Sequence, residues 1–524
     1  MTHQFSQVPK AEIQRSSFDR SHGLKTTFDA GYLYPILCDE ALPGDSFNVN
    51  MTGFARLATP IFPLMDNMRM ETFFFAVPNR LLWDNWQKFN GEQTNPGDST
   101  EYTIPSMQPF QAVTGSLSDY MGIPTNVLAL TGVSSLWHRA YNLIWNEWFR
   151  DQNLQDSLVV DTSDASDAQS AYAIQRRGKR HDYFTSCLPW PQKGDPVSIP
   201  LGGNAPITGI GIDTAGGAPG AIGSVNETGG TVAAYTGWSA ATATTVAVEE
   251  DPLNLGFPNI YADLSDASTI TINSLREAFQ IQRLLERDAR GGTRYIEIIK
   301  AHFGVSSPDS RLQRPEYLGG GSTVINISPI ASTVPTAVDP DTPQGNLAAV
   351  GTASLHNHGF TKSFTEHCTI IGLVSVRADL TYQQGLPRQF SRSTRYDFYW
   401  PALAHLGEQA VLNKEIYAQG SDNPEEDEAV FGYQERYAEY RYKPSAITGL
   451  MRSNALTGSL DAWHLSQDFA TLPVLGSEFI EENPPIDRVI AVTDEPAFIF
   501  DAHFSMRCAR PMPLYGVPGL IDHF

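Results

Sequence analysis

Residues 45–52 read Asp-Ser-Phe-Asn-Val-Asn-Met-Thr, an alternation of polar and apolar side chains. Successive side chains of a β-strand point to opposite faces, so Phe47, Val49 and Met51 share one face. Only that face is apolar, which is typical of a strand with one side buried and the other in water. The stretch therefore predicts a half-buried strand near the start of the folded part of the chain.

Further strand patterns lie at both ends of the chain. Residues 67–78 first alternate and then become fully apolar through 73–77, before Pro78 ends the pattern. Residues 369–376 (TIIGLVSV) and 497–504 (AFIFDAHF) carry the late strand patterns. Pairing early strands with late ones is the arrangement of a Greek-key or jelly-roll sandwich. We therefore predict a mainly β fold with helices and loops inserted between its strands.

Helical patterns occupy the middle of the chain. Residues 134–150 begin with serine and carry a wide apolar face, and two further helices are expected over 275–290 and 293–303. The tryptophans of the first helix could stack on nucleic-acid bases. Because Arg139 and Arg150 are its only cations, core packing or a subunit contact is the favoured interpretation.

Two stretches are rich in small residues. Residues 196–250 contain no Lys, Arg, His, Cys, Met or Phe and cannot build a core alone. An insert of this kind is usually projected at the surface and used for recognition, although a linker between two domains is the alternative. Its isolated Tyr235 and Trp238 are the attachment candidates, because such rings supply contact area in binding loops. The second stretch, 319–359, is expected to be extended and exposed.

The overall charge limits the partners of the chain. Asp and Glu number 58 against 36 Lys and Arg, a net charge of −22, so most of the surface should repel polyanions. Nucleic acid would have to be held locally or through a separate basic molecule. The four cysteines contain no CxxC pair, which favours a reducing compartment. No apolar run approaches the length of a membrane span, so we expect no membrane insertion.

Signatures of catalysis and metal binding are weak. The chain lacks the GxGxxG, GxxxxGK[ST], GxSxG and HExxH motifs, which argues against the common enzyme classes that carry them. His356, His358, His367 and Cys368 could share a metal ion, but no further ligand is spaced to complete the shell. The acidic run 424–428 lacks the pattern of a calcium loop. We expect no catalytic residue, metal or cofactor.

Basic residues gather in a few places. The strongest cluster, RRGKRH at 176–181, is followed by Tyr183 and Phe184, a combination that suits a phosphate backbone with a stacked base. Salt bridges between subunits of this acidic protein are an equally good interpretation. The candidates for facing nucleic acid or contacting another subunit are Lys10, Arg15, Arg20, Lys25, Arg176, Arg177, Lys179 and Arg180.

Six motifs resemble one protein family. They are KRHDYFTS (179–186), LPWPQKG (188–194), TPQGNLA (342–348), LVSVRADLTYQQG (373–385), FGYQERYAEYR (431–441) and ARPMPLYGVPG (509–519). Together they resemble the major capsid proteins of the microviruses, which are small single-stranded-DNA bacterial viruses, and the gokushovirus branch is the more similar one. The resemblance covers nearly the whole chain except 196–250 and parts of 90–130.

The resemblance implies a viral jelly roll, an eight-stranded antiparallel β-sandwich with large insertions. It further implies a T=1 icosahedral shell around circular single-stranded DNA, with contacts between copies at the five-, three- and two-fold axes. The insert would form a protrusion at the three-fold axis and meet a host receptor. A small basic DNA-binding protein would be a partner, and the virion would be assembled in the host cytoplasm. An acidic coat cannot neutralise its genome by bulk charge, which agrees with the need for such a partner.

The sequence divides the chain into arms, strands and insertions. Residues 1–30 and 509–524 are expected to be extended and ordered only by neighbouring subunits, because an arm with few apolar groups cannot offset its own ordering entropy. The expected segments are an N-terminal arm (1–40), jelly-roll strands with helical excursions (41–195), the insert (196–250), a helical insertion (251–318), an extended loop (319–360), the remaining jelly-roll strands (361–508) and a C-terminal arm (509–524).

Two other classes of protein share some of these features. A carbohydrate-binding or carbohydrate-active β-sandwich protein would use long loops with exposed Trp and Tyr to hold sugars. A fibre or spike adhesin would form trimers without shells. Particle size separates the three, since only a capsid protein would sediment as a large shell.

Overall fold

The computed structural model describes residues 14–99, 101–197, 207–208, 240–242, 245–246, 261–262, 272–304, 313–336 and 343–516. The chain divides into two compact units, one made of residues 1–191 with 291–524 and the other of residues 192–290. Among the described residues, no helix combines the length and the apolar character needed to cross a membrane.

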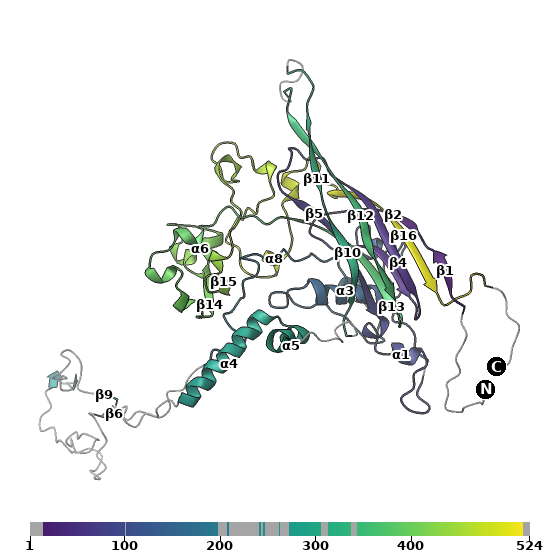
Figure 1. Ribbon diagram of the computed structural model, residues 1–524, viewed down its shortest axis with the longest axis horizontal. Helices are drawn as coiled ribbons and strands as arrows, with labels where there is room; N and C mark the ends of the chain where they lie inside the picture. Colours follow the sequence, from purple (N-terminus) through teal and green to yellow (C-terminus); the bar gives the residue numbers. More distant parts are fainter. Residues whose placement is uncertain are drawn as a thin grey trace, which may run out of the picture. The chain divides into compact units, whose positions relative to one another are not determined.

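The larger unit is built on one antiparallel sheet, which has ten strands within the described ranges (Figure 1). Its path of eight strands runs β1-β16-β4-β12-β10-β5-β13-β3, with β2 paired to β16 and β11 paired to β12. The curled sheet confirms the predicted jelly-roll sandwich with insertions. The strands are β1 (Ser16–Asp19), β2 (His22–Phe28), β3 (Tyr34–Ala41), β4 (Ser46–Leu57), β5 (Met68–Pro78), β10 (Glu316–Val324), β11 (Asn326–Ala331), β12 (Leu347–Ser363), β13 (Cys368–Ala378) and β16 (Phe498–Arg510).

The predicted strand at 45–52 is the first part of β4, and it lies between β16 and β12. Its side chains alternate between buried and exposed as the sequence pattern requires, and Phe47, Val49 and Met51 are all buried. Met51 lies opposite Phe504 of β16, which has the same alternation. Early strands therefore pair with late ones, and their shared apolar face fills the core between the two halves of the sheet.

The two halves of the sheet meet where β10 lies beside β12, and glycines form this corner. The register between these strands consists of one pair, Gly320 with Gly359. A Cβ atom at Gly320 would collide with the carbonyl oxygen of Thr72, and one at Gly359 with the carbonyl oxygen of Val49. Only glycine allows the backbones to approach this closely. The expectation of an extended loop over 319–360 is therefore wrong for β10, β11 and β12.

The N-terminal segment also differs from the expected arm. β1 pairs with the end of β16 through residues 16–19, and β2 pairs with its start. Phe28 of β2 is fully buried and stacks on Phe498. The idea that residues 16–28 are ordered only by neighbouring subunits is wrong, because hydrogen bonds to a strand of the same chain offset the ordering entropy of a segment with few apolar side chains.

Helices and small sheets are inserted between these strands. The helix expected over 134–150 is α3 (Leu136–Ile144) followed by a π-helical turn (Trp145–Phe149), and α3 packs on Phe75 and Leu373 of the sheet. The remaining helices of this unit are α1 (Trp86–Phe89), α2 (Leu117–Tyr120), α5 (Tyr295–Phe303), α6 (Asn413–Ile416), α7 (Pro424–Asp427) and α8 (Ser477–Ile480). A two-stranded sheet of β14 (Glu408–Leu412) and β15 (Val430–Glu435) forms a further small core with α6 and α8.

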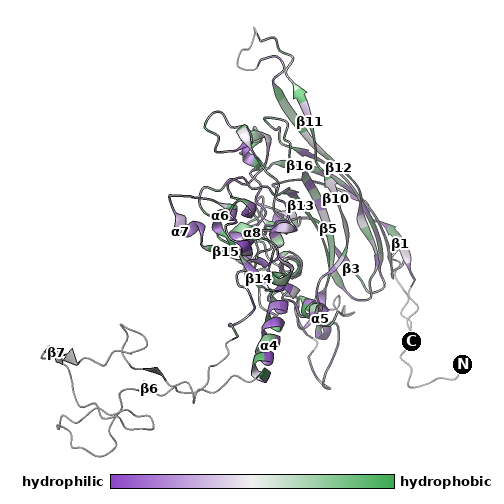
Figure 2. Ribbon diagram, turned by 60° about the vertical axis from the view of Figure 1, so that its left-hand side comes forward, coloured by the Kyte–Doolittle hydropathy of each residue, from purple (hydrophilic) through white to green (hydrophobic). Residues whose placement is uncertain are grey.

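The smaller unit contains α4 (Ile272–Gly291) for nearly all of its length, and this confirms the helix expected at 275–290. Both polar and apolar side chains are distributed along α4 (Figure 2). Its short strand pairs are β6 (Ile207–Thr208) with β9 (Tyr261–Ala262), and β7 (Ala240–Thr242) with β8 (Thr245–Val246).

Candidate nucleic-acid interface

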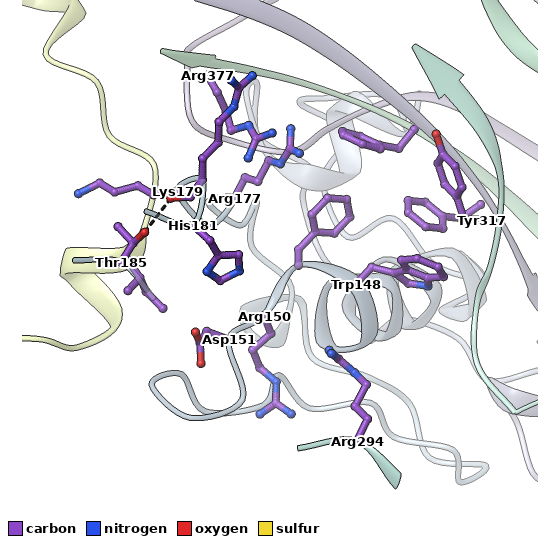
Figure 3. Close-up of a pocket in the computed structure, with 16 residues that line it drawn as sticks. Trp148, Arg150, Asp151, Arg177, Lys179, His181, Thr185, Arg294, Tyr317 and Arg377 are labelled. Atoms are coloured by element: carbon purple, nitrogen blue, oxygen red, sulfur yellow. Dashed lines mark hydrogen bonds between the residues drawn. The ribbon is translucent and has the colours of Figure 1, made fainter. Parts of the chain in front are cut away.

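A cavity of about 520 Å³ in the larger unit lies beside the basic segment 177–181 (Figure 3). Six cationic side chains and five aromatic rings line it, together with one carboxylate, Asp151. This composition contrasts with a chain whose net charge is −22. The cations are Arg150, Arg177, Lys179, Arg180, Arg294 and Arg377, and the rings are Phe73, Phe75, Trp148, Phe149 and Tyr317.

Main-chain hydrogen bonds fix the basic segment on both sides. The Arg177 amide donates to the carbonyl oxygen of Gly31 at 2.8 Å. On the other side, the Lys179 amide donates to Ile480 and the Glu482 amide donates to Arg177, both at 2.7 Å. The segment is therefore held in an extended form, which presents successive side chains in opposite directions.

Arg177 is largely buried and reaches a carboxylate of the main sheet. Its guanidinium donates to Glu71 of β5 and lies 4.6 Å from the centre of the Phe73 ring. Arg377 of β13 donates to the same carboxylate at 2.8 Å. Burial lowers the pKa of Arg177 to about 10. Burial alone would raise the pKa of Glu71, but the positive charges of Arg177 and Arg377 lower it, so this carboxylate stays ionised and neutralises part of the cluster.

Lys179 extends away from the centre of the cavity and is buried. Its ammonium donates to the carbonyl oxygen of Phe479 at 2.6 Å and lies 4.7 Å from the centre of the Phe479 ring. Burial lowers its pKa. Arg176 donates to the carbonyl oxygen of Glu482 at 2.9 Å and covers the ring of Tyr32. These contacts lie within one chain, whereas the sequence predicted contacts of the cluster with nucleic acid or with another subunit.

Arg180 and Arg150 are the more available cations of the cavity. Arg180 is 36% exposed and lies 3.4 Å from Asp379 and 3.7 Å from Glu71, so neither ion pair is tight. Arg150 donates to the carbonyl oxygen of Gln155 at 3.2 Å and makes no ion pair with the described residues. Both can contribute charge to a bound anion without giving up a short ion pair.

The remaining candidates lie elsewhere in the chain. Arg15 donates to Ser46 at 2.6 Å, and Arg20 makes a two-pronged contact with Asp39 at 2.6 and 2.9 Å. Lys25 forms an exposed ion pair with Asp501 at 3.2 Å. None of the three lines the cavity. Lys10, Tyr235 and Trp238 lie outside the described residues.

His358, the most buried of the histidines considered for a metal, has a structural environment. Its Nδ1 lies 2.8 Å from the Thr72 hydroxyl and its Nε2 lies 3.0 Å from the Thr323 hydroxyl. Burial lowers its pKa, so the ring is neutral near pH 7. The ring also occupies the space beside Gly321, and so it belongs to the glycine corner of the sheet.

Most of the cavity could not be found from the sequence pattern. Arg150, Arg294 and Arg377 are isolated in the sequence and reach the cavity only through the fold. The apolar run 73–77 does not distinguish the two faces of β5: Phe74 lies in the main core, whereas Phe73 and Phe75 lie on the other face, where they line the cavity. Because side chains alternate between the two faces of a strand, the sequence could have predicted that Phe73 and Phe75 lie on the face opposite Phe74.

Glu482 is a buried carboxyl group close to the basic segment. Its Oε1 accepts from the Ala378 amide at 3.4 Å, and Oε2 has no hydrogen-bond partner among the described residues. Burial raises its pKa to about 7, although Lys179 and Arg377 act in the opposite direction. Because the folded state holds this proton more tightly than the unfolded state does, the contribution of Glu482 to stability is complete below about pH 4.5 and declines as the pH rises to about 7.

Glu482→Gln should therefore stabilise the unassembled subunit at high pH. We expect no difference from the parent near pH 4, and a gain of up to about 3 kcal/mol in the free energy of unfolding near pH 8, because glutamine stays neutral. Urea unfolding of parent and variant at several pH values measures this difference in stability. A variant that is equally stable or less stable than the parent near pH 8 would contradict the assignment.

Comparison with known proteins identifies the family of the chain. The family described as "Capsid protein (F protein)" matches residues 6–520. The chain belongs to this family of phage capsid proteins. It is 48% identical over 543 residues to capsid protein VP1 of Bdellovibrio phage phiMH2K, covering 100% of this chain and 98% of the relative.

Two further relatives agree with this assignment. Capsid protein VP1 of Chlamydia phage 1 is 46% identical, with 99% of this chain and 98% of the relative covered. Capsid protein VP1 of Spiroplasma virus 4 is 37% identical, with 99% and 97% covered. All three relatives belong to microviruses, which confirms the resemblance seen in the motifs. The chain is a structural capsid protein of the virus particle, and copies of it assemble into a shell.

Proposed function

We propose that copies of this capsid protein close into a T=1 icosahedral shell around circular single-stranded DNA, and that the cavity beside 177–181 holds a nucleotide of that DNA. The observation that carries the proposal is the lining of the cavity, which holds six cationic side chains in a chain of net charge −22, with Arg150 and Arg180 as the more available of them. A coat of this net charge can hold a polyanion only through local positive sites.

Single-stranded DNA binding also uses aromatic rings on which bases stack, and the cavity has such rings. Trp148 is 37% and Tyr317 is 43% exposed, and their ring centres lie 6.0 Å apart. The Trp148 indole donates to the carbonyl oxygen of Pro315 at 2.8 Å, which fixes its orientation. Stacking of a base on such a ring contributes roughly 1–3 kcal/mol. Trp148 and Tyr317 thus offer a stacking surface, and Arg150 and Arg180 line the same cavity.

The double variant Arg150→Gln, Arg180→Gln should weaken binding of a thymidine oligonucleotide to unassembled subunits about tenfold at low salt. Each lost phosphate contact should also reduce the dependence of log affinity on log salt by about 0.7. Fluorescence anisotropy at several salt concentrations measures both. Arg441→Gln is the matched control, because Arg441 is exposed and lies outside the cavity. Equal affinities and slopes for parent and double variant would refute the proposal.

The other parts of the proposal rest on composition and on the resemblance to microvirus capsid proteins. A separate small basic DNA-binding protein would supply the positive charge that this chain lacks. The insert at 196–250 would form the three-fold protrusion that meets a host receptor, with Tyr235 and Trp238 as its contact rings. The four free cysteines support assembly in the reducing host cytoplasm. We propose a structural role for the chain.

A further inference from the structure

Residues 388–406 and 435–443 form an exposed surface that lies outside the cavity, and the second segment overlaps the motif at 431–441. Five of its side chains, here called the aromatic patch, are Tyr396, Phe398, Tyr399, Trp400 and Tyr440. Each is between 41% and 66% exposed. A group of exposed large rings is unusual on a protein that stays monomeric, and usually marks an interaction site.

Contacts within the patch join these rings into one surface. The centres of the Tyr399 and Tyr440 rings are 6.2 Å apart, and the Tyr440 hydroxyl accepts from the Tyr399 amide at 3.2 Å. Buried Tyr437 lies beneath them and donates to the carbonyl oxygen of Phe398 at 3.1 Å. The Trp400 indole donates to the carbonyl oxygen of Arg395 at 3.0 Å. The rings of Tyr399, Tyr440 and Trp400 are therefore held in place before any partner arrives, which lowers the entropy cost of binding.

The backbone beneath the patch is also constrained. Tyr437 has φ of +64°, a left-handed conformation that residues other than glycine rarely adopt. Its amide donates to the Gln409 side chain at 3.2 Å, and Gln409 in turn donates to Glu439 at 2.6 Å. These bonds connect the patch to the β14–β15 sheet, so it is a fixed part of the larger unit.

The charges of this surface differ from those of the rest of the chain. The two segments hold six Lys and Arg against three Asp and Glu, whereas the whole chain has a net charge of −22. Arg392 lies 4.2 Å from the centre of the Tyr440 ring and 3.6 Å from Glu439, and Arg395 lies 4.7 Å from the centre of the Trp400 ring. The patch is thus apolar and mildly basic, with its arginines close to rings.

We infer that a second copy of this chain covers the aromatic patch in the assembled shell. Tyr, Trp and Arg are the residues that dominate the energy of protein interfaces. The remaining surface of any copy is acidic on average, so it is complementary to this basic face. Nucleic acid is the weaker fit, because Arg392 and Arg441 are already paired with carboxylates of their own chain and phosphate binding draws on free cations.

Cysteine labelling tests this inference. Tyr396→Cys places a thiol in the patch, and a maleimide-linked polyethylene glycol reports its accessibility. Native thiols should react slowly, since Cys187, Cys368 and Cys508 are buried and burial raises the pKa of Cys38 to about 12. We expect labelling in intact shells to be at least about tenfold slower than in unassembled subunits, whether or not the shells contain DNA.

The comparison of DNA-free with DNA-containing shells separates the possible partners. Protection in DNA-containing shells alone would assign the patch to nucleic acid and overturn the inference. Equal labelling of shells and subunits would overturn it too. If Tyr396→Cys fails to fold, Ser393→Cys places the thiol on the same exposed loop and leaves every ring intact, with the same results expected.

Discussion

Gly320→Ala should prevent the larger unit from folding. The added Cβ atom would collide with the carbonyl oxygen and carbon of Thr72, which are backbone atoms of the neighbouring strand β5. Neither strand can move aside, because Gly320 is paired on one edge with β5 and on the other with Gly359 of β12. We expect a loss of more than about 4 kcal/mol in the free energy of unfolding, which is a large part of the stability of an ordinary domain.

A second strand glycine provides the control for this prediction. Gly23 of β2 has an ordinary backbone conformation, and a Cβ atom there would meet its nearest neighbour at 3.7 Å, which is normal contact. Gly23→Ala should change stability by less than about 0.5 kcal/mol. Soluble yield, circular dichroism and urea unfolding measure both variants. A folded Gly320→Ala protein with the stability of Gly23→Ala would show that the corner can widen.

The sequence identifies strands well wherever one face is apolar. In β4 and β16 the side chains alternate, so the pattern predicts both their position and their buried face. The pairing of early with late strands follows because these patterns lie at opposite ends of the chain. Composition misleads at β10. The run Gly319, Gly320 and Gly321 is typical of a loop, but here it allows β10 to approach the backbones of its neighbouring strands closely. That use of glycine depends on the neighbouring strand, which local sequence does not specify.

Local sequence was also not sufficient to predict which charges of the candidate site are paired. The cluster 176–181 is visible because its cations are adjacent in the sequence, but their partners come from distant segments. Glu71, which lies 106 positions before Arg177, accepts from Arg177 and Arg377. Phe479 accepts from Lys179 across 300 positions. Sequence reasoning could therefore count the positive charges but could not tell which are neutralised within the chain.

Removing the side chain of Arg139 should strongly destabilise the larger unit. Arg139 lies on α3 and its side chain is fully buried. Its guanidinium makes a two-pronged contact with Asp167 at 2.7 and 2.8 Å. It also donates to the carbonyl oxygens of Leu82, Ser163 and Ala165 at 3.0 to 3.1 Å. One side chain thus joins α3 to two loops, which are also connected to each other by hydrogen bonds from Trp83 and Asn85 to Asp164.

Arg139→Met keeps much of the volume but leaves the buried Asp167 carboxylate with the Tyr172 hydroxyl as its one hydrogen-bond donor among the described side chains, at 2.7 Å. Removing one partner of a buried ion pair costs about 3–5 kcal/mol, because the remaining charge stays out of water. Urea unfolding of unassembled subunits measures this loss. The exposed pair of Arg441 with Glu435 is the matched control, and Arg441→Met should cost at most about 1 kcal/mol.

Arg139→Lys separates the charge of the guanidinium from its shape. An ammonium can neutralise Asp167, but it cannot reach both carboxylate oxygens and three carbonyl oxygens at the same time. We therefore expect lysine to recover only part of the loss seen with methionine. Full recovery would mean that charge alone holds the loops. A loss below about 1 kcal/mol for Arg139→Met would mean that the apolar contacts of α3 and the hydrogen bonds between the two loops hold them, so the ion pair would have a minor role in this insertion.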